Sequence, residues 1–327
     1  MTARRRGTIV ALYAVCALTV LTAPALAQPK KKTPAPAPPS APVQENPQAD
    51  IAYGAFQRGY YLTALAEATK RAQQNDRYAM TLLGELYAQG FGVPRDDAKA
   101  AEWYKLAVAR GDRDAMFALA MFNLEGRAGP RNPDEAARLL AAAAKLGHAA
   151  AAYDLGLLYL QGQQFPQDFA RAAELFRQAA DAGNGEAEYA LATMYKEGRG
   201  APKDVAAAMH LMGLASIAGN VDAMVEYAIG QFNGIGVAKN EAAATRLLLI
   251  AAQRGSPIAQ DRLARVLMAG RGVPPDPTGA IKWHIVAKAA GAGDPDLDVF
   301  ASSQPQKIRD AAEAAAKKWM STPPPRS

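Results

Sequence analysis

The fold of this chain is decided by residues 77–112, which read RYAMTLLGELYAQGFGVPRDDAKAAEWYKLAVARGD. A stretch of the same length, 36 residues, recurs five more times without a gap and ends at residue 292. One glycine column marks the register and consists of Gly90, Gly126, Gly162, Gly198, Gly234 and Gly270. A second consists of Gly111, Gly147, Gly183, Gly219, Gly255 and Gly291, and alanine fills positions 3 and 31 of every unit. A fixed period of this kind predicts one structural unit that stacks on copies of itself.

Each unit is predicted to contain two helices. In the third unit, apolar residues recur at helical spacing up to Gly162, which can end a helix in the left-handed conformation. Asp168 is placed to cap a second helix that Gly183 ends, and Asn184 can cap the first helix of the next unit. The many alanines and glycines at apolar positions let helices approach closely. We therefore predict an all-α fold, an α-solenoid of stacked antiparallel helix pairs.

The predicted solenoid extends beyond the six units and occupies residues 46–320. Residues 46–76 read as one more unit whose loop is shortened by five residues. Residues 293–320 read as C-terminal capping helices, the last of which carries an apolar stripe that includes Trp319. Residues 321–327 read as a disordered tail.

Residues 1–27 predict a cleaved signal peptide. Three arginines precede an uncharged apolar run, and Ala25-Leu26-Ala27 supplies the small residues that signal peptidase requires. We therefore expect a periplasmic or secreted protein of a Gram-negative bacterium, with an uncleaved inner-membrane anchor as the alternative. The one cysteine, Cys16, lies in this segment, so the processed chain is expected to fold without disulfides.

Residues 28–45 are rich in proline and predict an extended, disordered linker. Lys30, Lys31 and Lys32 could contact a cell-wall polymer or anionic lipid, although a solvated linker is the simpler explanation. The chain carries 37 basic and 31 acidic residues, a net charge of +6. Six of the basic residues and only one acid, Glu45, lie in the first 45 residues, which leaves 31 against 30 beyond them. This balance argues against nucleic acid as a partner.

The first unit reads Leu83-Gly84-x-Leu86-Tyr87-x-x-Gly90-x-Gly92-Val93-Pro94-x-Asp96, followed by Ala100-Ala101-x-Trp103-Tyr104-x-x-Ala107 and Gly111-Asp112. This pattern resembles a Sel1-like repeat, a relative of the tetratricopeptide repeat with a longer loop between its helices. The fifth unit departs from it at Tyr227, Gly230 and Gln231. The resemblance implies an exported adaptor that binds other proteins. Some cysteine-rich relatives bind or slowly hydrolyse β-lactams, but this chain lacks their cysteines.

No pattern in the sequence predicts a catalytic residue, a metal site or a cofactor. His148, His210 and His284 fall at different positions of their units and have no second ligand nearby, so we expect them to cap or pack. The Gly-x-Gly triplets follow a helix and repeat with the period, which favours turns over phosphate-binding loops. We therefore expect a protein that is not an enzyme.

The predicted partner-binding face follows from the angular positions of residues on the first helix. Positions 3, 7, 8, 10 and 11 share one side, the expected core, and positions 2, 5, 9, 12 and 13 lie opposite, where related repeats line a concave groove. Apolar residues on this second side form what we call the apolar strip: Phe117, Met121, Leu124, Tyr153, Leu157, Leu160 and Tyr189. Solvent-facing positions are normally polar, so the strip predicts a groove for a peptide or helix. The alternative is that superhelical curvature buries it as ordinary core. No charged pocket is evident.

The function predicted from the sequence is that of a non-catalytic scaffold or adaptor of the cell envelope, which binds a partner protein or peptide in its concave groove. One alternative is a protein that binds or hydrolyses peptidoglycan or β-lactams. Another is a periplasmic regulator of a sensor kinase or of polysaccharide secretion.

Overall fold

The structure is a computed structural model, and it describes residues 51–163 and 165–321. The predicted signal peptide (1–27), the linker (28–45) with Lys30, Lys31 and Lys32, and most of the predicted tail lie outside the described residues.

The described residues form helices and no strands, which confirms the predicted all-α class. The helices are α1 (Ile51–Gln57), α2 (Tyr61–Ala72), α3 (Arg77–Gln89), α4 (Asp97–Val108), α5 (Arg113–Glu125), α6 (Pro133–Lys145), α7 (Ala149–Gln161), α8 (Phe169–Asp181), α9 (Gly185–Glu197), α10 (Val205–Ile217), α11 (Val221–Asn233), α12 (Glu241–Gln253), α13 (Pro257–Ala269), α14 (Pro277–Ala289), α15 (Pro295–Ser303) and α16 (Gln306–Ser321).

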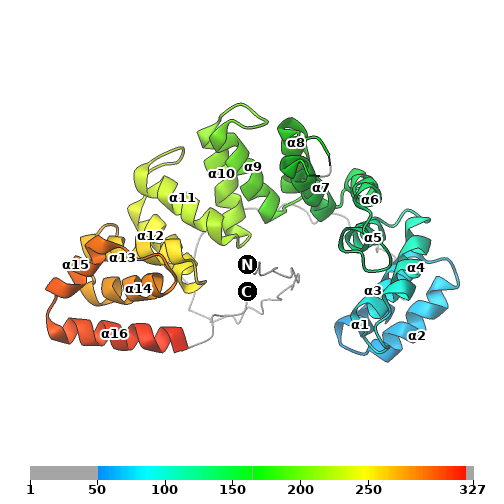
Figure 1. The fold of residues 1–327 in the computed structure, drawn as a ribbon, viewed down its shortest axis with the longest axis horizontal. Helices are drawn as coiled ribbons and strands as arrows, with labels where there is room; N and C mark the ends of the chain where they lie inside the picture. The colour runs from blue at the N-terminus through cyan, green and yellow to red at the C-terminus, as the bar shows by residue number, and fades with distance from the viewer. Residues whose placement is uncertain (1–50, 164, 322–327) are drawn as a thin grey trace, which may run out of the picture. The chain divides into compact units, whose positions relative to one another are not determined.

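The helices stack in chain order, as an α-solenoid requires (Figure 1). Within each 36-residue unit the odd-numbered first helix packs against the even-numbered second helix, and each second helix packs against the first helix of the next unit. The earlier pair, α1 and α2, packs on α3 in the same way. Because each helix touches its neighbours in sequence, the core is a series of local interfaces.

Helix ends follow the signals predicted from the sequence. The first helix of each unit ends at a glycine in the left-handed region, with φ between 66° and 74° from Gly90 to Gly270. The side chain of Asp168 accepts a hydrogen bond from the Arg171 N–H, and that of Asn184 accepts one from the Ala187 N–H, both at 2.9 Å. Each such cap satisfies a backbone donor that the helix leaves free.

The loop inside each unit is closed by one recurring backbone bond. The N–H at position 20 donates to the carbonyl at position 11, as Asp96 does to Tyr87 and Asp276 to Leu267, at 2.7 to 3.1 Å across the six units. In three of the later loops a second glycine, Gly200, Gly236 or Gly272, lies close to the backbone of the preceding unit. A Cβ atom at Gly236 would lie 2.6 Å from the Val205 carbonyl oxygen, so this glycine permits close backbone approach. The Gly-x-Gly triplets therefore serve as turns, as predicted.

Arginines of the loops bind acids of the preceding unit. Arg127 donates to Asp97 at 2.6 Å, and its guanidinium lies 4.1 Å from the centre of the Phe122 ring. Arg271 repeats the acid contact on Glu241, at 2.6 Å, and its guanidinium lies over the Phe232 ring of the preceding unit. The two contacts tie consecutive units together outside the apolar core.

The core consists mainly of alanine and leucine from both helices of each pair. The alanine at position 3 of every unit is at most 3% exposed. Positions 7, 8 and 10 are also buried throughout, with Tyr227 the one exception at position 7, whereas position 11 is half-buried in all six units.

Two helices follow the sixth unit. α16 packs on α14, and the Trp319 ring meets the Trp283 ring edge-on at 5.5 Å between centroids. Ala312 and Ala316 of α16 are fully buried. No helix between residues 51 and 321, with residue 164 left out, is long and apolar enough to cross a membrane.

Candidate functional site

The apolar strip lies on three consecutive first helices, α5, α7 and α9. All seven residues of the strip are half-buried, so none belongs to the fully buried core and none is fully exposed. The same holds for most other residues at positions 5, 9 and 12 of the units. The predicted face is therefore a partly covered surface, and the fold already covers most of each side chain.

The aromatic residues of the strip are held by intramolecular contacts. Phe117 stacks on the His148 ring at 4.5 Å, and Tyr153 packs at 5.6 Å from the Phe176 ring. His148 itself caps α7, since its Nδ1 accepts a hydrogen bond from the Ala151 N–H at 3.1 Å. Burial raises the pKa of Tyr153 and lowers the pKa of His148. These side chains are positioned before any partner arrives.

The structure divides the strip among three parts of the core. Phe117, Met121 and Leu124 pack on the N-terminal cluster, which extends from α1 to α8. Tyr153, Leu157 and Leu160 pack on the cluster around Phe176. Tyr189 packs against Met209 and Met212 of α10. The strip is thus built from consecutive units, each anchored on its own core.

Polar groups beside the strip are few. Asp154 on α7 is half-buried, and burial raises the pKa of its carboxyl to about 6. Beyond the strip, Lys196 of α9 and Glu226 of α11 pair at 2.8 Å. The strip is therefore followed, at the C-terminal end of α9, by a charged pair that links α9 to α11.

The angular prediction missed position 4 of the first helix. This position is buried in five of the six units, including the polar residues Glu188 (6% exposed) and Gln260 (1% exposed). Burial raises the pKa of Glu188. The reason is that each first helix is flanked by its own second helix and by that of the preceding unit, so a wider arc of its surface is covered.

The same face carries a cavity farther along the solenoid, between α11, α12 and α13. Its volume is about 330 Å³, and Ile229, Phe232 and Met268, from positions 9 and 12, line it. Arg262, Arg265 and Arg271 also line it. The expectation that no charged pocket exists is therefore wrong. This pocket could not be predicted from the sequence, because its arginines come from positions 6, 9 and 15. None of these positions is basic in all six units.

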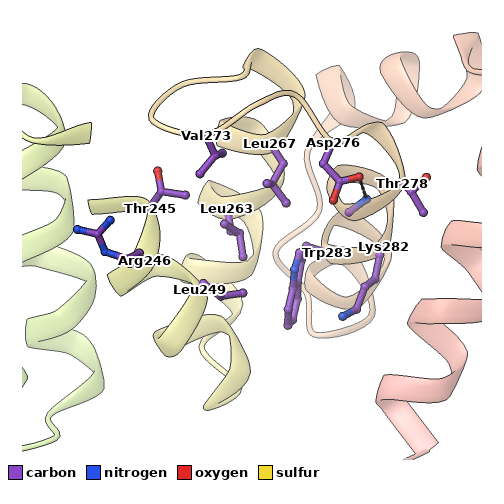
Figure 2. Close-up of a pocket in the computed structure, with 11 residues that line it drawn as sticks. Thr245, Arg246, Leu249, Leu263, Leu267, Val273, Asp276, Thr278, Lys282 and Trp283 are labelled. Carbon is purple, nitrogen blue, oxygen red and sulfur yellow. Dashed lines mark hydrogen bonds between the residues drawn. The ribbon is translucent and has the colours of Figure 1, made fainter. Parts of the chain in front are cut away.

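A second cavity, of about 460 Å³, lies on the other side of α13, between α12 and α14 (Figure 2). Leu263 and Leu267 of α13 face Trp283 of α14 across it, whereas the Arg246 guanidinium points away. The Lys282 ammonium lies 4.2 Å from the Trp283 ring centre, and burial lowers the pKa of Lys282. This cavity belongs to the second-helix side.

The remaining histidines offer no shared site. His210 is exposed on α10, and His284 is buried in α14, where its Nε2 lies 2.8 Å from the Asp298 carboxylate. In the described part of the chain, no three histidine, cysteine or acidic residues come together as a metal site would require.

The stacked helix pairs, the 36-residue period and the capped loops define an α-solenoid repeat protein. The Sel1 repeat family model matches six consecutive segments, and the chain belongs to this family; the segments are 77–112, 113–148, 149–184, 185–220, 221–256 and 257–291. Sel1 repeat proteins generally mediate protein–protein interaction and are generally non-catalytic.

Two solved structures share the fold. A Sel1 repeat protein from Oxalobacter formigenes is 24% identical, with a TM-score of 0.62, over 73% of this chain and 96% of that one. The protective antigen c5321 of uropathogenic Escherichia coli, which displays an SLR fold, is 23% identical, with a TM-score of 0.56, over 85% of this chain and 69% of that one. No curated protein is similar enough to match.

Proposed function

We propose that the chain is an exported, non-catalytic scaffold that binds a partner protein or peptide on the face formed by its first helices. The observation that carries the proposal is the apolar strip, because seven large apolar side chains on three consecutive helices are only partly covered by the fold. Apolar side chains that stay partly in water are a common feature of protein-binding surfaces.

Rigidity supports this function. Phe117 and Tyr153 are fixed against His148 and Phe176, so little side-chain entropy is lost when a partner binds. A helix or extended segment laid across α5, α7 and α9 could cover the parts of the strip that remain exposed. Export is proposed from residues 1–27, whose composition is that of a signal peptide.

The experiment is capture of partners from cross-linked bacterial extract by residues 28–327 and by a strip variant. The variant uses residues that the same positions carry in other units: Met121→Glu as in Glu85, Leu157→Thr as in Thr193, and Leu160→Lys as in Lys196. Because these positions accept polar residues elsewhere in the chain, the variant should remain helical.

The matched control places lysine at exposed leucines of the second-helix side, Leu106→Lys and Leu146→Lys, which are 44% and 49% exposed. We expect specific partners with the parent and with the control, and their loss with a folded strip variant. Capture that survives in the strip variant would contradict the proposed binding face.

A further inference from the structure

The cavity between α11 and α13 combines an apolar lining with a basic one. Ile229, Phe232 and Met268 are half-buried, and Val266 and Leu248 are buried beneath them. Three arginines contribute to the same lining, and no acidic residue does. Its volume of about 330 Å³ is at the lower end of the roughly 300–1,000 Å³ range of small ligand pockets.

Two of the arginines are held in place by acids that lie outside the lining. Arg271 pairs with Glu241 at 2.6 Å and lies over the Phe232 ring at 4.1 Å. Arg265 pairs with Asp261, at 3.4 Å, and with the buried Asp294. Each guanidinium has five N–H donors, more than these contacts use.

The third arginine is free to bind. Arg262 lies on α13 and is exposed, and no acid pairs with it among residues 51–163 and 165–321. Arg262 and Arg265 are three residues apart on the same helix, so their side chains lie on neighbouring parts of its surface. The cavity thus presents one unpaired cation and two partly neutralised ones around an apolar floor.

We propose that this cavity binds a segment of a partner protein in which a large apolar side chain is adjacent to a carboxylate. The apolar side chain would occupy the space between Phe232 and Met268, and the carboxylate would accept hydrogen bonds from Arg262 and its neighbours. A basic segment would be repelled by the three arginines. An acidic segment without an apolar side chain would leave the apolar lining of the cavity exposed to water. This inference rests on the proposed function and gives the first-helix face a chemical preference.

The test uses fluorescein-labelled peptides and the purified protein at low salt. The probe Gly-Ser-Gly-Leu-Glu-Phe-Glu is compared with Gly-Ser-Gly-Leu-Gln-Phe-Gln, which lacks the charge, and with Gly-Ser-Gly-Ser-Glu-Ser-Glu, which lacks the apolar groups. We expect the first to bind more tightly than either, by about two- to fivefold over the uncharged peptide, the upper part of the range typical of a solvent-exposed charge pair.

Two variants test whether the cavity causes the preference for the Glu peptide. Arg262→Gln should abolish the preference for the Glu peptide over the Gln peptide, and its exposed position predicts unchanged stability. Arg246→Gln removes the same charge from α12, where the guanidinium points away from the neighbouring cavity, and should retain the preference.

The inference is overturned if the three peptides bind equally or do not bind. It is also overturned if Arg246→Gln loses the preference for the Glu peptide as fully as Arg262→Gln does. These results are separate from the fate of the proposed function, because partner capture by the apolar strip is measured with variants on α5 and α7. Capture that depends on the strip, together with peptides that fail to discriminate, rejects only the role of the cavity.

Discussion

At the scale of single residues, size matching between positions 8 and 28 shapes the interior of each helix pair. Glycine at position 8 faces an aromatic residue, as in Gly156 with Phe176, where an added Cβ would lie 2.7 Å from the ring. Gly84 and Tyr104 form the same kind of pair in the first unit. Where position 8 is alanine, position 28 is a smaller side chain, as in Ala120 with Leu140. The volume of the pair is thereby kept compatible with close packing.

This matching predicts non-additive effects. Gly156→Ala should lower the free energy of unfolding by roughly 1–3 kcal/mol, because overpacking against Phe176 outweighs the helix propensity gained. Adding Phe176→Leu recreates the Ala120–Leu140 pair of the second unit and should recover at least about 1 kcal/mol relative to the sum of the single changes. Urea unfolding of the four proteins measures this coupling, and strictly additive values would refute the matching.

At the scale of elements, the salt bridge between Arg127 and Asp97 joins the second unit to the first. Hydrogen bonds from Arg95 and Arg127 lower the pKa of Asp97 to about 2, below the ordinary 3.8. A carboxyl with a depressed folded-state pKa contributes stability above its unfolded pKa and loses it as the pH falls toward the folded value. The contribution should therefore be complete at neutral pH and vanish between about pH 4 and pH 2.

We accordingly expect Asp97→Asn to reduce the free energy of unfolding at pH 7 by no more than about 2 kcal/mol. The difference from the parent should shrink to near zero at pH 2. Urea midpoints at pH 7, 4 and 2 measure this, with Glu102→Gln on the exposed side of the same helix as the control. A difference that is independent of pH would show that the charge of Asp97 is not the cause.

The elements themselves could be predicted from the sequence because their signals are local. The glycine column, the capping residues and the alanine columns each act within a few residues of where they occur. The burial of Glu188 could not be read from α9 alone, since it depends on packing between units. The same applies to the fifth unit: Tyr227 fits against Gly213, where a Cβ would lie 3.3 Å away, and Gly230 leaves room for Met209. The unusual residues of α11 therefore match unusual residues of α10 in size.

The candidate site was predictable only in part, for a related reason. Most residues at positions 5, 9 and 12 are half-buried, although Ala88 and Val225 are buried, and their role as a binding face stays a prediction. Helical angles could not show that Arg262, Arg265 and Arg271 meet at one cavity, because two arginines come from α13 and the third from the loop after it.

At the scale of the whole molecule, a solenoid must cover the open core face of its last unit. α16 does so through Trp319 against Trp283. Trp319→Ala should lower the free energy of unfolding by roughly 1–3 kcal/mol, less than the truncation of a fully buried aromatic residue, because Trp319 is half-buried. Met320→Ala, at a neighbouring side chain that is 46% exposed, should have little effect. Equal unfolding midpoints for the two variants would show that α16 does not support the core.

Photo-cross-linking can show directly whether partners bind the first-helix side. A benzophenone amino acid would replace Glu125, Gln161 or Glu197, the exposed last residues of α5, α7 and α9. In the control it would replace Arg138, Glu174 or His210, which are exposed at one equivalent position of α6, α8 and α10. We expect one partner to be cross-linked from the first set and not from the second. Cross-linking of that partner from the second set alone would contradict it.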